Sequence, residues 1–215
     1  MSKYSEFHRI PTAIINKLKT DRLYERIDKK QAILKILEYY QLAFDKIYNE
    51  TGDTRKLSDW NIDFSECVYN NHPHVLAVYI SNNIVNFHLN EQFSNCGILV
   101  SSKTYLAYTN IGFGSLLQCI KEDIAYLFGY SFLSYTDIVL NHGERTNTKL
   151  ILNTGAKEIF RGLNTRSGNH IAIWMKDINT YYNTRTVTEL PEIIEKTEEK
   201  AETVLETKKL ETTDF

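Results

Sequence analysis

A change in hydrophobic period constrains the fold of this 215-residue chain more than any other feature. Between about Lys29 and Glu50, apolar residues recur at spacings of three and four, the period of a helix that is buried along one face. Between Val75 and Leu89, two short runs rich in β-branched and aromatic residues flank Ser81-Asn82-Asn83, which is typical of a β-hairpin. The chain is therefore expected to combine helices with antiparallel strands.

Local signals place the remaining elements. A capping box of Asp28 and Gln31 should start the long helix, and a shorter helix should follow Pro11. A mostly buried helix is predicted over about 115–128, with a second capping box of Ser115 and Gln118 and a stop at Gly129. Further strands are predicted in the ranges 98–100, 103–108, 132–140, 149–152 and 170–175, and a short helix at 156–163.

The second strand of the hairpin alternates between apolar and polar residues. We expect Val85, Phe87 and Leu89 to be buried, with Asn86 and His88 on the opposite face. The predicted fold is α+β: an N-terminal helical pair, a largely antiparallel sheet of about five to seven strands, and one buried helix packed on it.

The chain divides into a domain and a charged tail. The domain should span residues 1–188, with a helical part at about 1–52 and a sheet-rich part at about 60–177. The segment 189–215 contains nine acidic and four basic residues and few apolar ones, so it should form a helical or flexible tail. The rest of the chain is only weakly basic, which does not favour a dedicated nucleic-acid binder.

Cysteine usage and hydropathy limit the class of protein. The three cysteines, at 67, 96 and 119, contain no CxxC pair, which argues against a disulfide framework and a zinc ribbon. We find no secretory signal pattern and no apolar run long enough for a membrane helix. The expected location is therefore the cytoplasm or a virion, without membrane insertion.

The glycine-containing segment Gly112-Phe113-Gly114-Ser115 precedes the predicted buried helix. We interpret it as a tight loop that leads into a capped helix. Binding of a phosphate at the helix N-terminus is the alternative, because backbone N–H groups there favour an anion. Neither a Walker lysine nor a complete GxGxxG pattern supports it.

Two histidines, His72 and His74, flank Pro73, and His88 could join them across the hairpin. The pair resembles the His-hydrophobic-His motif of rolling-circle replication endonucleases. That resemblance implies a divalent metal at the pair and Tyr126 as the nucleophile that attacks a DNA phosphate. A fuller ligand set is missing, so we predict no metal site here and no catalytic residue.

Other chemically reactive residues have structural interpretations. We expect Cys119 to be a small core residue, and the adjacent pair Glu122 and Asp123 to form a solvated helix face. The C-terminal third combines arginines with aromatic residues, which are enriched at protein interfaces. The predicted interface residues are Arg161, Arg166, Trp174, Tyr181, Tyr182 and Arg185.

These observations lead to a non-enzymatic prediction. The chain should be a structural subunit of a larger assembly, such as a phage virion or a contractile injection machine. Its partners would be other protein subunits in a homo- or hetero-oligomer, with nucleic acid less favoured and no cofactor. The alternative is a nucleic-acid-binding or metal-dependent DNA-processing protein of a mobile element.

Overall fold

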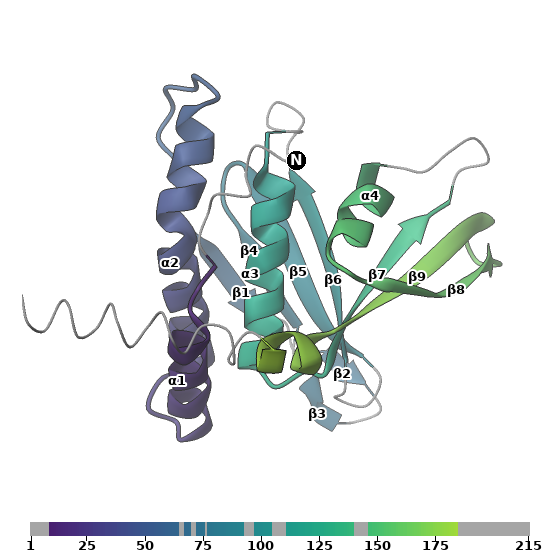
Figure 1. Cartoon of the computed structure of the whole chain (residues 1–215), viewed down its shortest axis with the longest axis horizontal. Coiled ribbons are helices and arrows are strands. Elements are labelled where there is room, and N and C mark those ends of the chain that lie inside the picture. The colour runs from purple at the N-terminus through teal and green to yellow at the C-terminus, as the bar shows by residue number, and fades with distance from the viewer. Residues whose placement is uncertain are drawn as a thin grey trace, which may run out of the picture.

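The computed structural model describes residues 9–64, 67–69, 72–75, 77–92, 97–104, 111–139 and 146–184 (Figure 1). Its labelled helices are α1 (Thr12–Leu23), α2 (Lys29–Asn49), α3 (Phe113–Leu127) and α4 (Thr146–Asn153). The strands are β1 (Asn61–Phe64), β2 (Cys67–Tyr69), β3 (His72–Val75), β4 (Ala77–Ser81), β5 (Val85–Gln92), β6 (Gly97–Thr104), β7 (Phe132–Ile138), β8 (Lys157–Asn164) and β9 (Asn169–Asp177). A short helical segment, 178–184, follows β9.

The main sheet has seven strands in the order β1-β4-β5-β6-β7-β9-β8, and β2 pairs with β3 separately. Every pairing in the main sheet is antiparallel except that of β6 with β7, which α3 connects. The helices α2, α3 and α4 lie on one face of this sheet (Figure 1). The predicted α+β fold is therefore confirmed, and the parallel pair is the feature that the sequence analysis did not anticipate.

The core lies between α2, α3 and the sheet. Val85, Phe87 and Leu89 are fully buried on the helix side of β5, whereas Asn86 and His88 are half-buried on the other side, as predicted. Aromatic contacts join the layers. Phe44 of α2 packs against Phe113 of α3 at 4.6 Å between ring centroids, and also against Trp60, which in turn meets Phe87.

The ends of two helices test the predicted capping boxes. Asp28 accepts a 2.7 Å hydrogen bond from the backbone N–H of Gln31, so the box at α2 is confirmed. The box at Ser115 is wrong, because α3 begins earlier at Phe113 and its N-cap, Gly112, offers no side chain. Gly112 has a φ of 115°, a backbone conformation that L-residues rarely adopt. The predicted stop at Gly129 is confirmed by its φ of 82°.

Two segments differ from the sequence prediction. The range 149–152 lies within α4, and the predicted short helix at 156–163 is mostly the strand β8. β8 is an edge strand whose residues are nearly all exposed, so no buried face imposes the alternation that identifies a strand. Its conformation comes from pairing with β9, a partner that short-range periodicity cannot reveal.

The tail 189–215 and Arg185 lie outside the described residues. Within the described part of the chain, the helices are too short or too polar to cross a membrane.

Candidate functional site

Three consecutive charged residues of α3, Lys121, Glu122 and Asp123, are enclosed in the protein, with exposed fractions of 3%, 1% and 0%. The prediction that Glu122 and Asp123 form a solvated face is therefore wrong. α3 lies between α2 and the sheet, so most of its surface meets other elements. Buried charges at these positions need partners, and the structure supplies them from distant parts of the chain.

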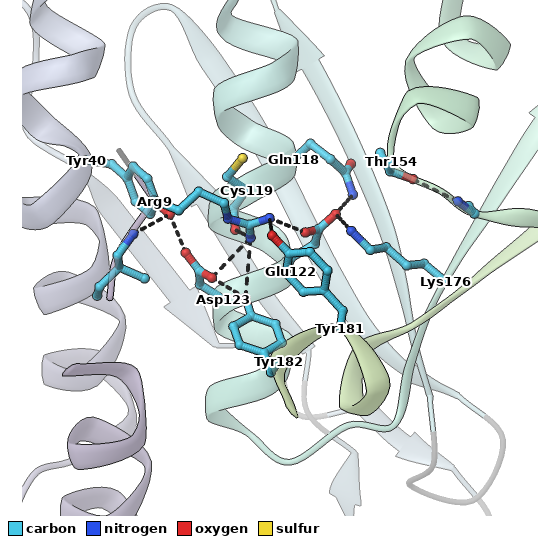
Figure 2. Close-up of polar contacts among 12 residues, drawn as sticks. Arg9, Tyr40, Gln118, Cys119, Glu122, Asp123, Thr154, Lys176, Tyr181 and Tyr182 are labelled. Atoms are coloured by element: carbon cyan, nitrogen blue, oxygen red, sulfur yellow. Dashed lines mark hydrogen bonds and ion pairs between the residues drawn. The ribbon is translucent and has the colours of Figure 1, made fainter. Parts of the chain in front are cut away.

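Arg9 joins both carboxylates (Figure 2). Its Nη1 lies 2.7 Å from Glu122 Oε2, and its Nη2 lies 3.2 Å from Asp123 Oδ1. The guanidinium also donates to the hydroxyl of Tyr181 and to the backbone carbonyl of Cys119. Burial alone would lower the pKa of Arg9, but the neighbouring charges, Asp123 foremost, raise it, so this cation stays charged.

Asp123 accepts hydrogen bonds from two tyrosines. The hydroxyl of Tyr40 on α2 lies 2.5 Å from Oδ2, and the hydroxyl of Tyr182 contacts Oδ1. Burial raises the pKa of both phenols, and the charge of Asp123 raises it further, so both remain neutral donors. Tyr182 also stacks on Tyr126 at 4.0 Å between ring centroids. These contacts attach α2 and the segment 178–184 to α3.

Glu122 extends the network toward β7 and β9. Lys176 Nζ on β9 lies 2.6 Å from Glu122 Oε1, and Gln118 Nε2 donates to the same oxygen at 3.0 Å. Gln118 also contacts the hydroxyl of Tyr135 on β7. Burial would raise the pKa of Glu122, but Arg9 and Lys176 outweigh it and lower the pKa.

Two cations balance two carboxylates in this cluster, which we call the α3 network: Arg9, Tyr40, Gln118, Glu122, Asp123, Tyr135, Lys176, Tyr181 and Tyr182. It joins the segment before α1 to α2, α3, β7, β9 and the segment 178–184. The described residues contain no group of His, Cys, Asp or Glu that could hold a metal ion. Because its charged members pair with one another, we assign the α3 network a structural role. The candidate ligand site lies where this network meets the sheet.

That place is the parallel pair β6 and β7. The two strands pair at three positions only, from Gly97 with Phe132 to Leu99 with Ser134. Beyond these positions β6 continues to Thr104 beside β5, and β7 continues to Ile138 beside β9. Within the described residues, no strand pairs with the edges of β6 and β7 that face each other there. We call this separation of β6 from β7, which Figure 1 shows, the strand divergence. Its apex is the last register pair, Leu99 with Ser134.

The N-terminus of α3 lies at the open end of the strand divergence. Because β6 and β7 are parallel, their carboxyl ends lie at the same edge of the sheet, and α3 begins after β6. The first N–H groups of a helix have no partner within the helix. Gly112 caps this helix without a side chain, and Gly114 lacks the Cβ that would lie 3.3 Å from Leu150 of α4.

Two hydroxyl groups lie at the apex. Ser134 is 2% exposed, and its Oγ has no hydrogen-bond partner in the structure. Tyr135 is the first residue of β7 beyond the apex, and its hydroxyl belongs to the α3 network. Burial raises the pKa of Tyr135, so its phenol is a neutral donor. The α3 network therefore reaches the strand divergence through one residue.

Lys121 on α3 and His88 on β5 interact electrostatically, and the interaction is repulsive when both are charged. Burial lowers the pKa of Lys121 to about 8, although the charge of Glu122 opposes that shift. Burial and the positive charge of Lys121 both lower the pKa of His88. His88 is therefore largely neutral at pH 7.

The predicted interface residues do not form one surface. Arg161 on β8 and Arg166 in the β8–β9 turn are exposed, and Arg161 forms a 2.6 Å ion pair with Glu158. Trp174 and Tyr182 are buried inside the protein, and Tyr181 contacts Arg9 in the α3 network. A role of the exposed arginines in binding another protein stays a prediction.

The residues that the nuclease resemblance names lie on three different elements. His72 and His74 belong to β3, and His88 belongs to β5 of the other sheet. Tyr126 is 9% exposed, stacks on Tyr182 and donates a hydrogen bond to Asn16. Cys119 is half-buried, and burial raises the pKa of its thiol to about 11, so the thiolate is scarce at neutral pH.

Sequence reasoning missed Arg9, Lys121, Ser134 and Lys176. A signal for Lys121 was present, because three adjacent charges interrupt an otherwise apolar helix. At least one of three adjacent helix positions must face inward when the helix is covered on most sides. Arg9 and Lys176 are far from α3 in the chain, and no local pattern connects them to it.

Comparison with known proteins gives only structural likenesses. No family model and no curated protein matches the chain. A protein described as an acetyltransferase from Salmonella typhimurium, with its cofactor acetyl-CoA, is 11% identical with a TM-score of 0.39; the match covers 56% of this chain and 95% of that one. An N-acetyltransferase from Staphylococcus aureus Mu50 is 14% identical with a TM-score of 0.40, and the match covers 56% of this chain and 99% of that one. A GNAT-family acetyltransferase from Streptococcus pneumoniae is 16% identical with a TM-score of 0.39, and the match covers 48% of this chain and 66% of that one.

These findings correct the functional prediction. The chain was expected to be a non-enzymatic subunit of a virion or injection machine, but several solved structures similar to it are described as acetyltransferases. The prediction is therefore wrong, and location in a virion is not supported. It relied on the absence of short catalytic motifs, on the abundance of tyrosine and asparagine, and on a tail that cannot bury itself. The DNA-processing alternative is also abandoned.

Proposed function

We propose that the chain binds an acyl-coenzyme A at the strand divergence and transfers the acyl group to an acceptor. The observation that carries this proposal is the separation of β6 and β7 beyond the Leu99–Ser134 pair, with the N-terminus of α3 at its open end. Ligands of open sheets bind outside the carboxyl ends of parallel strands, where neighbouring connections diverge. The ligand class is the one named in the Salmonella structure, acetyl-CoA.

The facing strand edges suit the pantetheine arm of such a ligand. Pantetheine is an extended chain with two amide groups. Each edge beyond the apex presents backbone N–H and C=O groups, which need hydrogen-bond partners when they are enclosed. An extended amide chain can supply them in the same way that a peptide adds to a sheet edge. The unpartnered hydroxyl of Ser134 offers a further contact at the apex.

The start of α3 suits the pyrophosphate. Backbone N–H groups and the helix dipole stabilise an anion at this end. Gly112 and Gly114 carry no side chain of their own that would cover the backbone here, which favours the close approach of a phosphate. The loop interpretation of the segment Gly112–Ser115 and the anion alternative are thus compatible.

The acyl transfer needs only general groups. A nucleophile of the acceptor attacks the thioester carbonyl carbon, the C–S bond breaks, and the thiolate of coenzyme A takes up a proton. The protein supplies orientation along the strands, which contributes strongly to the rate of such a reaction. Tyr135 is the first residue of β7 beyond the apex, and its neutral phenol contacts Gln118 of α3.

Isothermal titration calorimetry of the full chain with acetyl-CoA tests the proposal. We expect binding with a dissociation constant of roughly 1 μM to 1 mM, the range that is usual for enzyme substrates. Gly112→Ala should weaken it about tenfold or more, because a Cβ at a φ of 115° distorts the anion-binding turn.

Gly129→Ala is the matched control. It introduces the same kind of strain at the other end of α3, where φ is 82°. It should leave the affinity unchanged. Absence of heat for the wild type at millimolar acetyl-CoA, or equal weakening in both variants, would contradict the proposal.

A further inference from the structure

One edge of the main sheet is long and exposes apolar side chains. The two edge strands are β1, with four residues, and β8, with eight. In β8, Ile159, Phe160 and Leu163 have exposed fractions of 53%, 50% and 54%. Proteins usually protect a long edge, because its backbone groups can pair with another strand. Within the described residues, no strand pairs with the outer edge of β8.

The pairing of β8 with β9 determines which backbone groups of β8 point outward. The carbonyl of His170 accepts a 2.8 Å hydrogen bond from the N–H of Val139 and so points away from β8. Leu163 is the register partner of His170. Opposed residues of an antiparallel pair exchange both backbone hydrogen bonds or neither. The N–H and C=O of Leu163 therefore point outward, and by the same alternation so do those of Arg161.

Between these two residues, Gly162 suits the close approach of a second backbone. A Cβ at this position would lie 2.6 Å from the ring of Phe160, so the ring lies over the glycine. A glycine inside a strand often marks a place where another backbone comes close. The register of β8 shifts between Glu158 and Phe160 and is regular from there to Asn164. Gly162 is the centre of the regular part.

We propose that the protein forms a symmetric dimer through β8, in which the strands of two copies pair antiparallel with Gly162 at the two-fold axis. In this register Gly162 faces Gly162 of the second copy, and Arg161 faces Leu163 of the second copy. The second kind of pair occurs twice by symmetry and exchanges backbone hydrogen bonds. The two glycines form the closely spaced kind of pair, with about 4.5 Å between their Cα atoms.

The side chains around this axis are complementary to those of a second copy. Each Phe160 ring lies over its own Gly162, so the two rings would meet across the axis at roughly 4.5–7 Å, where aromatic pairs attract. On the other face, the exposed Leu163 would lie against the methylene stem of Arg161. Glu158 holds the guanidinium of Arg161 at 2.6 Å, which offsets the repulsion between the two arginines. A second copy supplies all of these contacts by symmetry.

This inference goes beyond the proposed function and does not depend on it. Arg161 is one of the interface residues predicted from the sequence, and the dimer gives it a definite contact. The interface lies at the edge of the sheet, beyond β9, and leaves the strand divergence uncovered.

Sedimentation equilibrium of the full chain tests whether the dimer forms. The paired segment is short, so we expect a weak dimer with a dissociation constant of roughly 10 μM to 1 mM, as is usual for small interfaces. A chain that stays monomeric at concentrations up to about 1 mM would overturn the proposal.

Two substitutions of one residue test the register. Leu163→Lys places a second cation opposite Arg161 of the other copy and should weaken the dimer about tenfold or more. Leu163→Glu places a carboxylate there and should leave the dimer at least as strong as the wild type. The side chain is exposed, so both variants should fold. Equal weakening in the two variants would indicate a general apolar contact and overturn this register.

Leu152→Lys is the matched control. It adds the same charge at an exposed leucine of α4, a helix that packs on β7, and should leave the dimer unchanged. Weakening equal to that of Leu163→Lys would contradict an interface at β8.

Amide hydrogen exchange locates the interface independently. Exchange at Arg161 and Leu163 should slow as the protein concentration rises, because their N–H groups would bond to the second copy. Exchange at Gly162 should not change, because its N–H points to β9. Concentration-dependent protection confined to other elements would overturn the proposal.

Discussion

Arg9 is the principal cation for two carboxylates that have no access to solvent. Its loss removes the cation that contacts both Glu122 and Asp123 and leaves the two carboxylates buried. Breaking a buried ion pair from one side costs about 3–5 kcal/mol. We therefore expect Arg9→Met to lower the free energy of unfolding by about that amount in urea denaturation. Arg26→Met, which breaks an exposed pair with Asp21, should cost about 1 kcal/mol or less. Equal costs would show that the α3 network contributes little.

Lys121 makes stability depend on pH in the alkaline range. Its pKa is about 8 in the folded protein and about 10.4 in an unfolded chain. Between these values the unfolded chain binds more protons, so stability rises with pH. We expect the free energy of unfolding to increase by on the order of 2 kcal/mol from pH 7.5 to pH 9.5, and Lys121→Met to remove most of this increase. An unchanged pH dependence in the variant would contradict the assigned burial.

For single residues, the sequence reveals the residue types but not the residues that they contact. The adjacent carboxylates in α3 were visible and were interpreted as solvated, because Arg9 lies more than a hundred positions earlier and shares no local pattern with them. The alternation in β5 is different, since the residues that define each face are near neighbours. Burial of Val85 and Phe87 could therefore be predicted, whereas burial of Glu122 could not.

Among the elements, α2 depends on its N-terminal cap. Asp28 and Gln31 satisfy backbone donors reciprocally, and the sequence contained the whole signal within four residues. We expect Asp28→Ala to lower the free energy of unfolding by about 1 kcal/mol, measured by urea denaturation. Lys29→Ala, one position later and exposed, should change it by less than about 0.5 kcal/mol. A larger effect of the lysine variant would mean that the cap is not the source of stability.

The elements of the candidate site were harder to predict than α2. The strands β6 and β7 were each expected in part, but their parallel pairing depends on the crossover through α3, which no local signal specifies. The strand divergence exists only because β6 follows β5 and β7 follows β9 beyond the apex. Both pairings are long-range properties, so the site was not predictable from motifs.

For the whole molecule, the predicted division at residue 189 can be tested by truncation. The tail has few apolar residues and many like-charged neighbours, so a helix there would be marginal on its own. We expect deletion of residues 189–215 to leave the melting temperature within about 2 °C of the full chain, less than a change of 1 kcal/mol would produce. A much lower melting temperature would show that the tail belongs to the folded domain.

The central claim is that an acyl-coenzyme A lies between β6 and β7 with its phosphates at the start of α3. Mapping coenzyme A by ¹H–¹⁵N chemical shifts on the full chain locates the ligand most directly. We expect shifts concentrated at Val100–Thr104, Ser134–Ile138 and Gly112–Ser115, with little change in α2 and β8. Shifts confined to other elements, or none at saturating coenzyme A, would contradict it.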